Sequence, residues 1–457
     1  MSTARRFDVA VIGGGAAGVA AALEAARLGA SVALVEAERP GGSCVHFTCI
    51  PTSVLLDAAE GFVRARELAV AGVLAAGETL QLGRANDRAR ALVRSLAAGL
   101  ETSLRRARVE VVAGHASFRE PGLLTVAGAG ELAADAVVIA SGARWEPPAI
   151  PGLPADRLVT PDVVQSWREP PPSCLVLGGG PSDGVFALEY ATLLALAGSA
   201  VTLAAPGPAG FAGFDDDLQP LLADLLQPLG ITVVTGASPL RAEGEAVILA
   251  TAAGERPVAA ACVLAADPRV PSARGLALDH AGLAPGVDGA IPVDEGCATA
   301  VPGIYAAGDI TGRGMLSSTA AVQGRVAGAN AAGDRRLARL SAVPILVHTV
   351  PPVAAVGRTA SDAQEAGIPL ATATLGFEGT AASVARGGHP GLLRLHADRR
   401  TGEIIGVQAA GPGAHELVSA AAALMQAEAA ADQAAALVAW HPSPLELLAE
   451  AARRLGG

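Results

Sequence analysis

A strand, a glycine-rich turn, a helix and a second strand occur twice in this chain, and that repeat limits the class of fold. The first copy runs from Phe7 through the glycine cluster at 13–18 to Glu36, and the second lies within 170–205. Two apolar strands joined by a helix form a βαβ unit, in which the strands lie parallel in one sheet. We therefore expect an α/β protein with two Rossmann-like dinucleotide-binding domains.

The first turn has every part of a phosphate-binding site. Gly13 permits a tight turn, Gly15 lets the backbone approach a pyrophosphate, and Gly18 allows the helix to pack closely on the strand. The start of the helix offers free N–H groups and a favourable dipole. Glu36, about twenty residues further on, is placed to accept a hydrogen bond from a ribose hydroxyl. These residues predict a bound dinucleotide.

The second turn is less regular. It begins with Gly178 and Gly180, but its last glycine comes one position late, and Asp183 would repel a phosphate at the helix start. The next strand ends at 204–206 in Ala-Ala-Pro, without an acid for a ribose hydroxyl or an arginine for a 2′-phosphate. The second unit could therefore bind NADH, NADPH or no nicotinamide nucleotide.

Composition narrows the class of protein. A net charge of −11 argues against a nucleic-acid partner. Five cysteines are too few for a secreted disulfide scaffold, and no signal-peptide pattern opens the chain. The most apolar stretch, 417–440, contains Glu428 and Asp432, so we expect one long buried helix there and no membrane span. A cytoplasmic protein is the expectation.

The segment GGSCVHFTCIPTS, residues 41–53, places Cys44 and Cys49 five positions apart. Taken alone, the pair is either a redox-active dithiol or two small buried side chains. Redox work requires a nearby acid–base group, because a leaving thiolate must be protonated. The segment WHPSPLE at 440–446 contains such a candidate pair in His441 and Glu446.

Together these segments resemble the FAD-dependent pyridine nucleotide–disulfide oxidoreductases, a family that includes dihydrolipoamide dehydrogenase, glutathione reductase and mercuric reductase. The cysteine segment is similar to the family's GGTCxNxGCIPSK, and VPGIYAAGDI at 301–310 to its second FAD motif. HTVPPVAAVGRT at 348–359 resembles the start of its dimerisation domain, and the segment at 440–446 resembles its HPTxxE. The resemblance covers nearly the whole chain.

The resemblance implies a glutathione-reductase-like fold with a C-terminal α+β dimerisation domain. The FAD-binding domain would comprise 1–153 and 281–336, interrupted by an NAD(P)-type domain at 154–280. Residues 337–457 would form the interface of a homodimer.

It also implies roles for single residues. Cys44 would exchange with the substrate, and Cys49 would contact the flavin. His441 would give or take the proton and Glu446 would orient it, both supplied by the partner subunit. The remaining expected cofactor contacts lie in the matching motifs: Ser43, Ser141, Gly142, Asp309, Gly178, Gly180, Glu189 and Arg269. No metal site is expected.

Three departures from the family bear on electron transfer. Ser53 stands where the family carries a lysine that pairs with a glutamate, which corresponds to Glu189 here. Glu189 is then unpaired, protonated or paired with an arginine. The usual GRxPN reads PRVPS at 268–272, and His46 replaces a common asparagine. The thiol half of the site is intact, whereas the nicotinamide half is altered.

The leading hypothesis is an FAD-dependent dithiol–disulfide oxidoreductase that exchanges electrons with NAD(P)H or another acceptor and acts on a small-molecule thiol or disulfide. One alternative is a dithiol oxidase that uses oxygen and no nicotinamide. The other is a non-catalytic FAD-binding paralogue. The sequence does not identify the substrate or the direction of electron flow.

Overall fold

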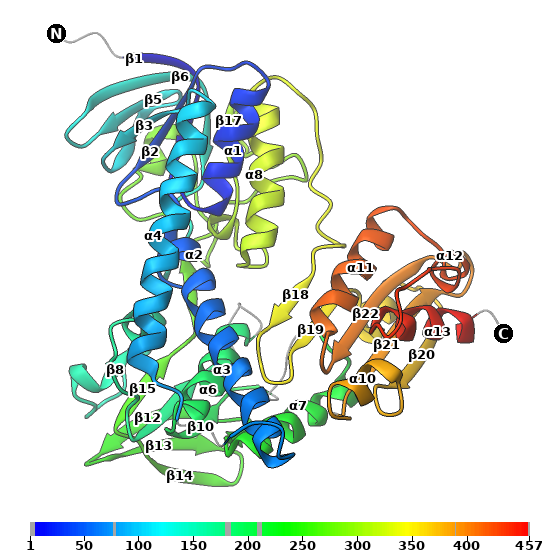
Figure 1. Ribbon diagram of the computed structural model, residues 1–457. Helices are drawn as coiled ribbons and strands as arrows, with labels where there is room; N and C mark the ends of the chain where they lie inside the picture. Colours follow the sequence, from blue (N-terminus) through cyan, green and yellow to red (C-terminus); the bar gives the residue numbers. More distant parts are fainter. Residues whose placement is uncertain (1–4, 76–78, 179–183, 208–212, 389, 456–457) are drawn as a thin grey trace.

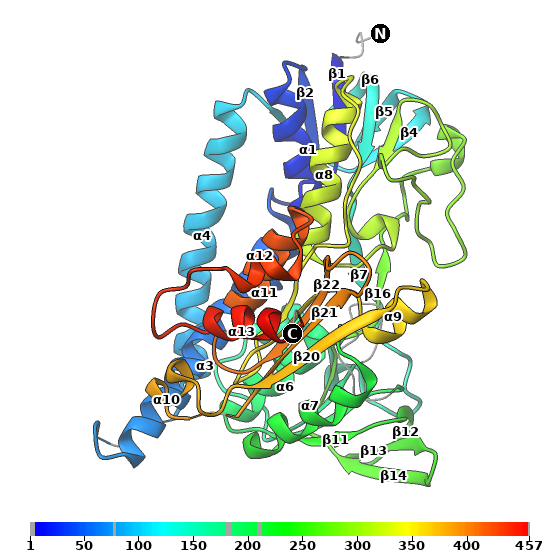
Figure 2. The same cartoon turned by 90° about the vertical axis from the view of Figure 1, so that its right-hand side faces the viewer.

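The computed structural model describes residues 5–75, 79–178, 184–207, 213–388 and 390–455 (Figures 1 and 2). Its strands form five sheets, three of them with five or more strands. Helices and sheets alternate along the chain, which confirms the expected α/β class with a further C-terminal unit.

The first large sheet is built around the first βαβ unit. Its strand order is β3-β2-β1-β6-β5-β4, and β17 pairs in parallel with β6. A segment near residue 305 thus returns to the sheet that the N-terminus begins. The strands are β1 (Arg5–Ile12), β2 (Val32–Glu36), β3 (Glu110–Ala113), β4 (Ala116–Glu120), β5 (Leu123–Val126), β6 (Gly130–Ile139) and β17 (Ile304–Ala306).

Helices α1 (Ala16–Arg27) and α8 (Ser317–Ala331) lie side by side on this sheet (Figure 1). Small residues set their distance: a Cβ on Gly324 or Gly328 would come 2.2 Å from the carbonyl oxygen of Ala17 or Ala21. With 3% aromatic residues, the chain builds its core mainly from aliphatic side chains, and between α1 and α8 the backbones themselves come close.

The region after the cysteines is helical, as expected. It contains α2 (Gly42–His46), α3 (Cys49–Val70) and α4 (Leu82–Arg106). Pro51 fits the first turn of α3 because the N–H that proline lacks has no partner there. Arg105 and Arg106 close α4, where cations complement the helix dipole.

The second βαβ unit forms a parallel sheet in the order β11-β10-β9-β15-β8. Helix α6 (Val185–Leu196) is buried over its first ten residues and contacts β9, β10 and α3. A three-stranded meander and a two-stranded ribbon accompany the sheet. The elements of this region are β7 (Ala143–Trp145), β8 (Leu158–Val159), α5 (Pro161–Val164), β9 (Ser173–Leu177), β10 (Ala200–Ala204), α7 (Gln219–Leu226), β11 (Thr232–Val234), β12 (Ser238–Glu243), β13 (Ala246–Thr251), β14 (Gly254–Ala259), β15 (Cys262–Ala265) and β16 (Arg269–Pro271).

The C-terminal unit is an antiparallel sheet in the order β18-β19-β22-β21-β20, with helices packed on one face (Figure 2). Its elements are β18 (Ile345–Val347), β19 (Val353–Gly357), α9 (Ala360–Glu365), β20 (Leu370–Gly376), α10 (Ala381–Ala385), β21 (Leu392–Asp398), β22 (Ile404–Ala410), α11 (Ala414–Gln426), α12 (Ala431–Ala435) and α13 (Leu445–Leu455).

The prediction of a single long helix within 417–440 is wrong. The stretch forms α11 and α12, separated by a turn in which Glu428 has a φ of +53°. The backbone there pairs with the start of β22 instead: Ile404 donates to the carbonyl of Ala429, and Glu403 bridges to Ala430. The pairing of this turn with the sheet outweighs the preference of an alanine-rich stretch for helix. None of the described helices is both long and apolar enough to cross a membrane.

Candidate active site

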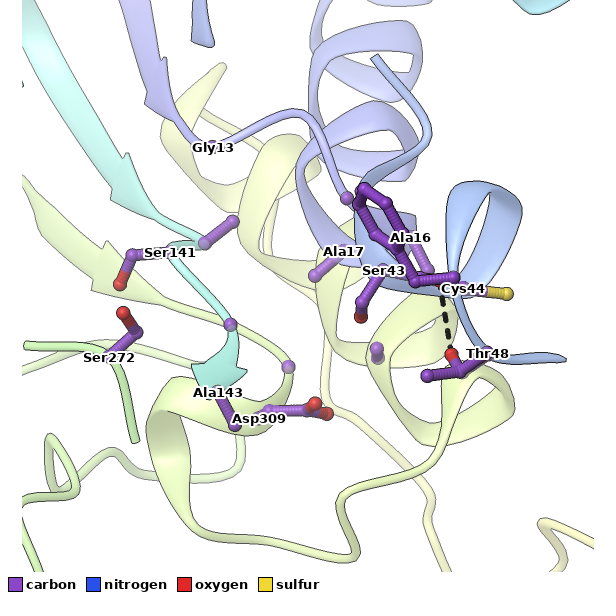
Figure 3. A pocket seen from close by; sticks show the side chains of 18 of the residues that line it. Gly13, Ala16, Ala17, Ser43, Cys44, Thr48, Ser141, Ala143, Ser272 and Asp309 are labelled. Atoms are coloured by element: carbon purple, nitrogen blue, oxygen red, sulfur yellow. Dashed lines mark hydrogen bonds between the residues drawn. The ribbon is translucent and has the colours of Figure 1, made fainter. Parts of the chain in front are cut away.

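A cavity of about 960 Å³ opens at the carboxyl ends of the first sheet and extends to α3 and α6. Four separated segments meet around it, as Figure 3 shows for Ser43, Ser141, Ser272 and Asp309. Most of the predicted site residues line it together: Gly13, Gly15, Glu36, Ser43, Cys44, Cys49, Ser141, Gly142, Glu189, Arg269 and Asp309.

The remaining predicted residues lie elsewhere. Gly18 and Gly178 do not line the cavity but allow close packing beside their turns. A Cβ on Gly178 would come 2.4 Å from the Cβ of Ala187. Gly180 and Asp183 lie outside the described residues.

The three glycines of the first turn have distinct physical roles. Gly13 has a φ of +98°, in the left-handed region that favours glycine. A Cβ on Gly18 would come 1.8 Å from the carbonyl oxygen of Gly13, so no side chain fits there. A Cβ on Gly15 would meet nothing within 4 Å. The space beside Gly15, at the start of α1, is where a pyrophosphate would lie.

The polar residues of the cavity fit an FAD. Glu36 closes β2, and its carboxylate accepts from the N–H groups of Gly14 at 2.5 Å and Glu38 at 2.7 Å, which fixes it beside the turn. The Ser141 hydroxyl is buried and has no hydrogen-bond partner among the described residues. A bound polar group would satisfy it.

The Arg269 side chain interacts with other residues of the protein. It comes from β16, which pairs with β7, and its guanidinium forms a buried ion pair with Asp309 at 2.9 Å. Cζ of the guanidinium lies 5.3 Å from the centroid of the Trp145 ring and 5.7 Å from that of the Phe186 ring. A contact from Arg269 to a nicotinamide nucleotide stays a prediction.

The cysteines stand as two thiols at one end of the cavity, and their environments differ. Cys49 is the first residue of α3, and its Sγ lies 3.0 Å from the hydroxyl of Ser317, the first residue of α8. The sulfur therefore lies at the start of α3 and next to the start of α8, and helix starts stabilise a thiolate.

Hydrogen bonds make the pKa values of Cys44 and Cys49 differ. A hydrogen bond from the Cys44 thiol lowers the pKa of Cys49 to about 6, against the opposing effect of burial, with further help from Ser317 and Thr48. The same hydrogen bond and burial raise the pKa of Cys44. Thr48 is held in place by its own bond to the Ser43 carbonyl at 3.1 Å (Figure 3). Neither Thr48 nor Ser317 was expected from the sequence.

Glu189 corrects an expectation, because its partner is a histidine. Its Oε1 accepts from the backbone N–H of His348 at 3.0 Å and lies 2.9 Å from the Nδ1 of the same residue. It is therefore neither unpaired nor bound to an arginine. No motif in the sequence indicates this contact, since Glu189 and His348 are 159 positions apart in the chain.

His441 and Glu446 form the predicted pair but do not line the cavity of their own chain. Nδ1 of His441 lies 3.0 Å from Oε1 of Glu446. The N–H of Ser443 and the His441 ring lower the pKa of Glu446. The imidazole is 70% exposed, and Trp440 beside it is 63% exposed.

The other cysteines have no link to the cavity. Cys174 and Cys262 oppose each other on β9 and β15, and both are buried. Burial raises the pKa of Cys297 to about 12. The described residues contain no group of histidines, cysteines and acids that could hold a metal ion.

Comparison with known proteins fits this geometry. The family model described as pyridine nucleotide-disulphide oxidoreductase matches residues 7–324, and the model of that family's dimerisation domain matches 343–452. A dihydrolipoyl dehydrogenase of Bacillus subtilis is 33% identical, with 97% of this chain and 98% of that protein covered.

Solved structures agree. LpdA from Mycobacterium tuberculosis superposes with a TM-score of 0.87 at 28% identity, covering 99% of both chains. The HOCl-induced flavoprotein disulfide reductase RclA from Escherichia coli gives 0.83 at 25%, covering 98% of this chain and 99% of that one. The expected family and its FAD cofactor are thus confirmed, and the chain belongs to the pyridine nucleotide-disulphide oxidoreductases.

Proposed function

We propose that this enzyme interconverts a small-molecule dithiol and its disulfide through Cys44 and Cys49, next to FAD in the cavity. The observation that carries the proposal is the pair of thiols at one end of that cavity, with the pKa of Cys49 lowered to about 6 and that of Cys44 raised. When bound, FAD accepts or supplies the two electrons of the exchange.

The two sulfurs have different tasks because their environments differ. Cys49 is held as a thiolate by Ser317, Thr48 and two helix starts, so it suits the position beside the flavin. Cys44 also lines a second, mainly apolar cavity of about 570 Å³ bounded by α1, α2, α4 and α8, which suits the approach of a substrate sulfur. Exchange at Cys44 opens or closes the Cys44–Cys49 bond while protons balance the charge.

The proton transfers are assigned to His441 of a second copy of the chain. Within a single chain, His441 and Glu446 are exposed and do not line the cavity that contains Cys44. The C-terminal unit that carries them is labelled α9 to α13 in Figures 1 and 2. That unit matches the family's dimerisation domain, and the neighbouring Val438 and Trp440 are 95% and 63% exposed. A homodimer would cover these apolar side chains and bring the imidazole to Cys44.

The electron partner has two candidates. Membership of the family favours NAD(P)H, bound by the unit that contains β9 and β10. The end of β10 favours the second candidate, a dithiol oxidase that uses oxygen, because Ala204 and Ala205 are buried and offer neither a carboxylate nor a guanidinium to a nucleotide ribose.

One experiment tests the thiol chemistry and separates these candidates. The holoenzyme and its Cys44→Ser variant are mixed without oxygen with NADH, NADPH or a small dithiol, and flavin absorbance is followed. We expect the dithiol to bleach the flavin of the wild type but not of the variant, which keeps its FAD. Equal reduction of both proteins by the dithiol would overturn the role of Cys44.

The reactions with NADH and NADPH identify the electron partner. Fast reduction by NADH or NADPH supports the first candidate. Reduction by the dithiol alone, followed by rapid reoxidation in air, supports the oxidase. Reduction by none of the three leaves the non-catalytic alternative.

A further inference from the structure

The Glu189–His348 pair lies inside the active-site cavity and is separate from the His441–Glu446 pair. Glu189 is 5% exposed, so its carboxylate requires a partner. Among the described residues that partner is His348 alone, through its ring at 2.9 Å and its backbone N–H at 3.0 Å. Both residues line the cavity with Cys49.

His348 faces several ionisable groups, and those it faces most closely are negative or become so. Burial opposes its protonation, but the hydrogen bond and charge of Glu189 outweigh burial and raise the pKa of His348. Glu60 and Cys49, both on α3, add to the rise. Asp162 of α5 lines the same cavity. Two elements, α6 and α3, thus supply the negative charges that favour the protonated form of this ring.

The negative charge of Glu189, which favours the charged form of His348, disfavours the charged form of Cys49. The carboxylate of Glu189 raises the pKa of Cys49, because one negative charge disfavours another nearby. A protonated His348 cancels that carboxylate. The chain contains no lysine, so the compensating cation has to come from an arginine or a histidine.

We propose that His348 is a positioning residue of this site, whose protonated ring neutralises Glu189 and thereby keeps Cys49 as a thiolate. A histidine differs from lysine or arginine in this role because it loses its charge near neutral pH. The thiolate of this enzyme is therefore coupled to a second titration. Above the pKa of His348, the bare carboxylate of Glu189 works against the thiolate.

The inference rests on the proposed function in one respect, that Cys49 is the sulfur beside the bound flavin. The test does not need turnover, so the two proposals can fail separately. In the holoenzyme with Cys44→Ser, the Cys49 thiolate is titrated by its long-wavelength absorbance beside the flavin. The rate of its alkylation by iodoacetamide at each pH gives a second measurement.

Substitutions at His348 and Glu189 are then added to the Cys44→Ser enzyme. Adding His348→Gln should raise the midpoint for thiolate formation by about one pKa unit, which is about a tenfold loss of thiolate at a pH below both midpoints. Adding Glu189→Gln to that variant should restore most of the loss, because the bare carboxylate is gone. His348→Lys should keep the low midpoint, because an amine supplies the same charge.

His46→Gln is the matched control. His46 lines the same cavity, but its ring is bonded elsewhere, with Nε2 2.9 Å from the Pro40 carbonyl oxygen. An unchanged or lowered midpoint in His348→Gln would overturn the proposal. So would an equal rise in His46→Gln, or a double variant that stays as high as His348→Gln. FAD content and melting temperature, measured on each variant, identify misfolded protein.

Discussion

At the residue scale, the first glycine turn shows how one motif contains positions with opposite tolerances. Gly15 and Gly18 are three positions apart, and both belong to the same sequence pattern. A Cβ on Gly18 would lie 1.8 Å from the Gly13 carbonyl oxygen, whereas the space beside Gly15 is open. Gly18 is therefore required for folding, and Gly15 is required only if a ligand fills that open space.

We therefore predict different results for the same substitution at these two positions. Gly15→Ala should leave the melting temperature of the apoprotein within a few degrees of wild type, because its φ of −73° suits alanine. Its affinity for FAD should fall by about tenfold or more, since the new methyl group meets the pyrophosphate. Titration of apoprotein with FAD measures this.

Gly18→Ala is the control for folding. It should destabilise the apoprotein itself by about 3 kcal/mol or more, because the clash is with backbone and cannot relax easily. A Gly15→Ala protein that binds FAD as tightly as wild type would place the pyrophosphate elsewhere.

The positions of residues in the cavity could be predicted from sequence where a local pattern carries them. Gly13, Glu36 and the two cysteines occupy the cavity because each belongs to a short motif. Ser317 and His348 could not be predicted in this way. Ser317 reaches Cys49 from 268 positions away, and His348 reaches Glu189 from 159 positions away. Such contacts depend on how separate units pack, which no local spacing encodes.

At the element scale, a buried carboxylate joins the middle of the chain to the C-terminal sheet. Asp215 precedes α7, yet its partners lie on β21, β22 and the start of α9. Its oxygens accept from Arg394 at 2.8 Å, His396 at 2.9 Å, Gln408 at 2.9 Å and the N–H of Ala360 at 2.7 Å. The sequence offered no motif for this cluster.

The cluster predicts a pH-dependent contribution to stability. Burial opposes ionisation of Asp215, but hydrogen bonds from His396, Ala360, Arg394 and Gln408 outweigh it and lower the pKa of Asp215 below its ordinary value of 3.8. A carboxyl group whose pKa is lowered by folding stabilises the fold above that ordinary value. The contribution is lost as the pH falls toward the lowered pKa of the folded state.

Asp215→Asn should therefore lower the free energy of unfolding by about 2–4 kcal/mol at pH 7, with a difference from wild type that shrinks below about pH 4. Urea unfolding at several pH values measures it. Asp217→Asn is the matched control, because Asp217 also pairs with Arg394 but is 67% exposed, and it should cost at most about 1 kcal/mol. Equal effects of the two substitutions would contradict the role of the buried cluster.

Elements were predictable where hydrophobic periodicity and glycine turns agreed, as in β1, α1 and β2. The helix expected within 417–440 failed for the converse reason. An alanine-rich stretch favours helix throughout, but Ala429 and Ala430 pair with the β22 edge, and that tertiary pairing outweighs local propensity.

At the scale of the whole molecule, the two halves of the thiol chemistry lie on different units. Cys44 and Cys49 line the cavity beside the first sheet, whereas His441 lies just before α13 and Glu446 in its first turn, both exposed. The domain boundaries at 153, 280 and 336 remain predictions, although β17 does return to the first sheet. The proposed function therefore requires two copies of the chain for a catalytic unit that contains both halves.

This requirement predicts complementation between inactive chains. Cys44→Ser and His441→Gln homodimers should each lose thiol turnover, the second by about 10²–10⁴-fold, because the leaving thiolate lacks its acid. A heterodimer of one chain of each kind contains one site with an intact Cys44 and the other chain's intact His441. Such a heterodimer, isolated with two different affinity tags, should recover about half of the wild-type rate per dimer.

The arrangement in which both substitutions lie on one chain gives the opposite result. A heterodimer of wild type with the Cys44→Ser, His441→Gln double variant has one defect in each of its two sites, because each site takes its cysteines and its histidine from different chains. It should be as slow as the single variants. If the sites instead lay within single chains, this heterodimer would retain half of the activity and the mixed one would have none. The pair of heterodimers therefore distinguishes a shared site from a self-contained one, whatever the substrate and the electron partner prove to be.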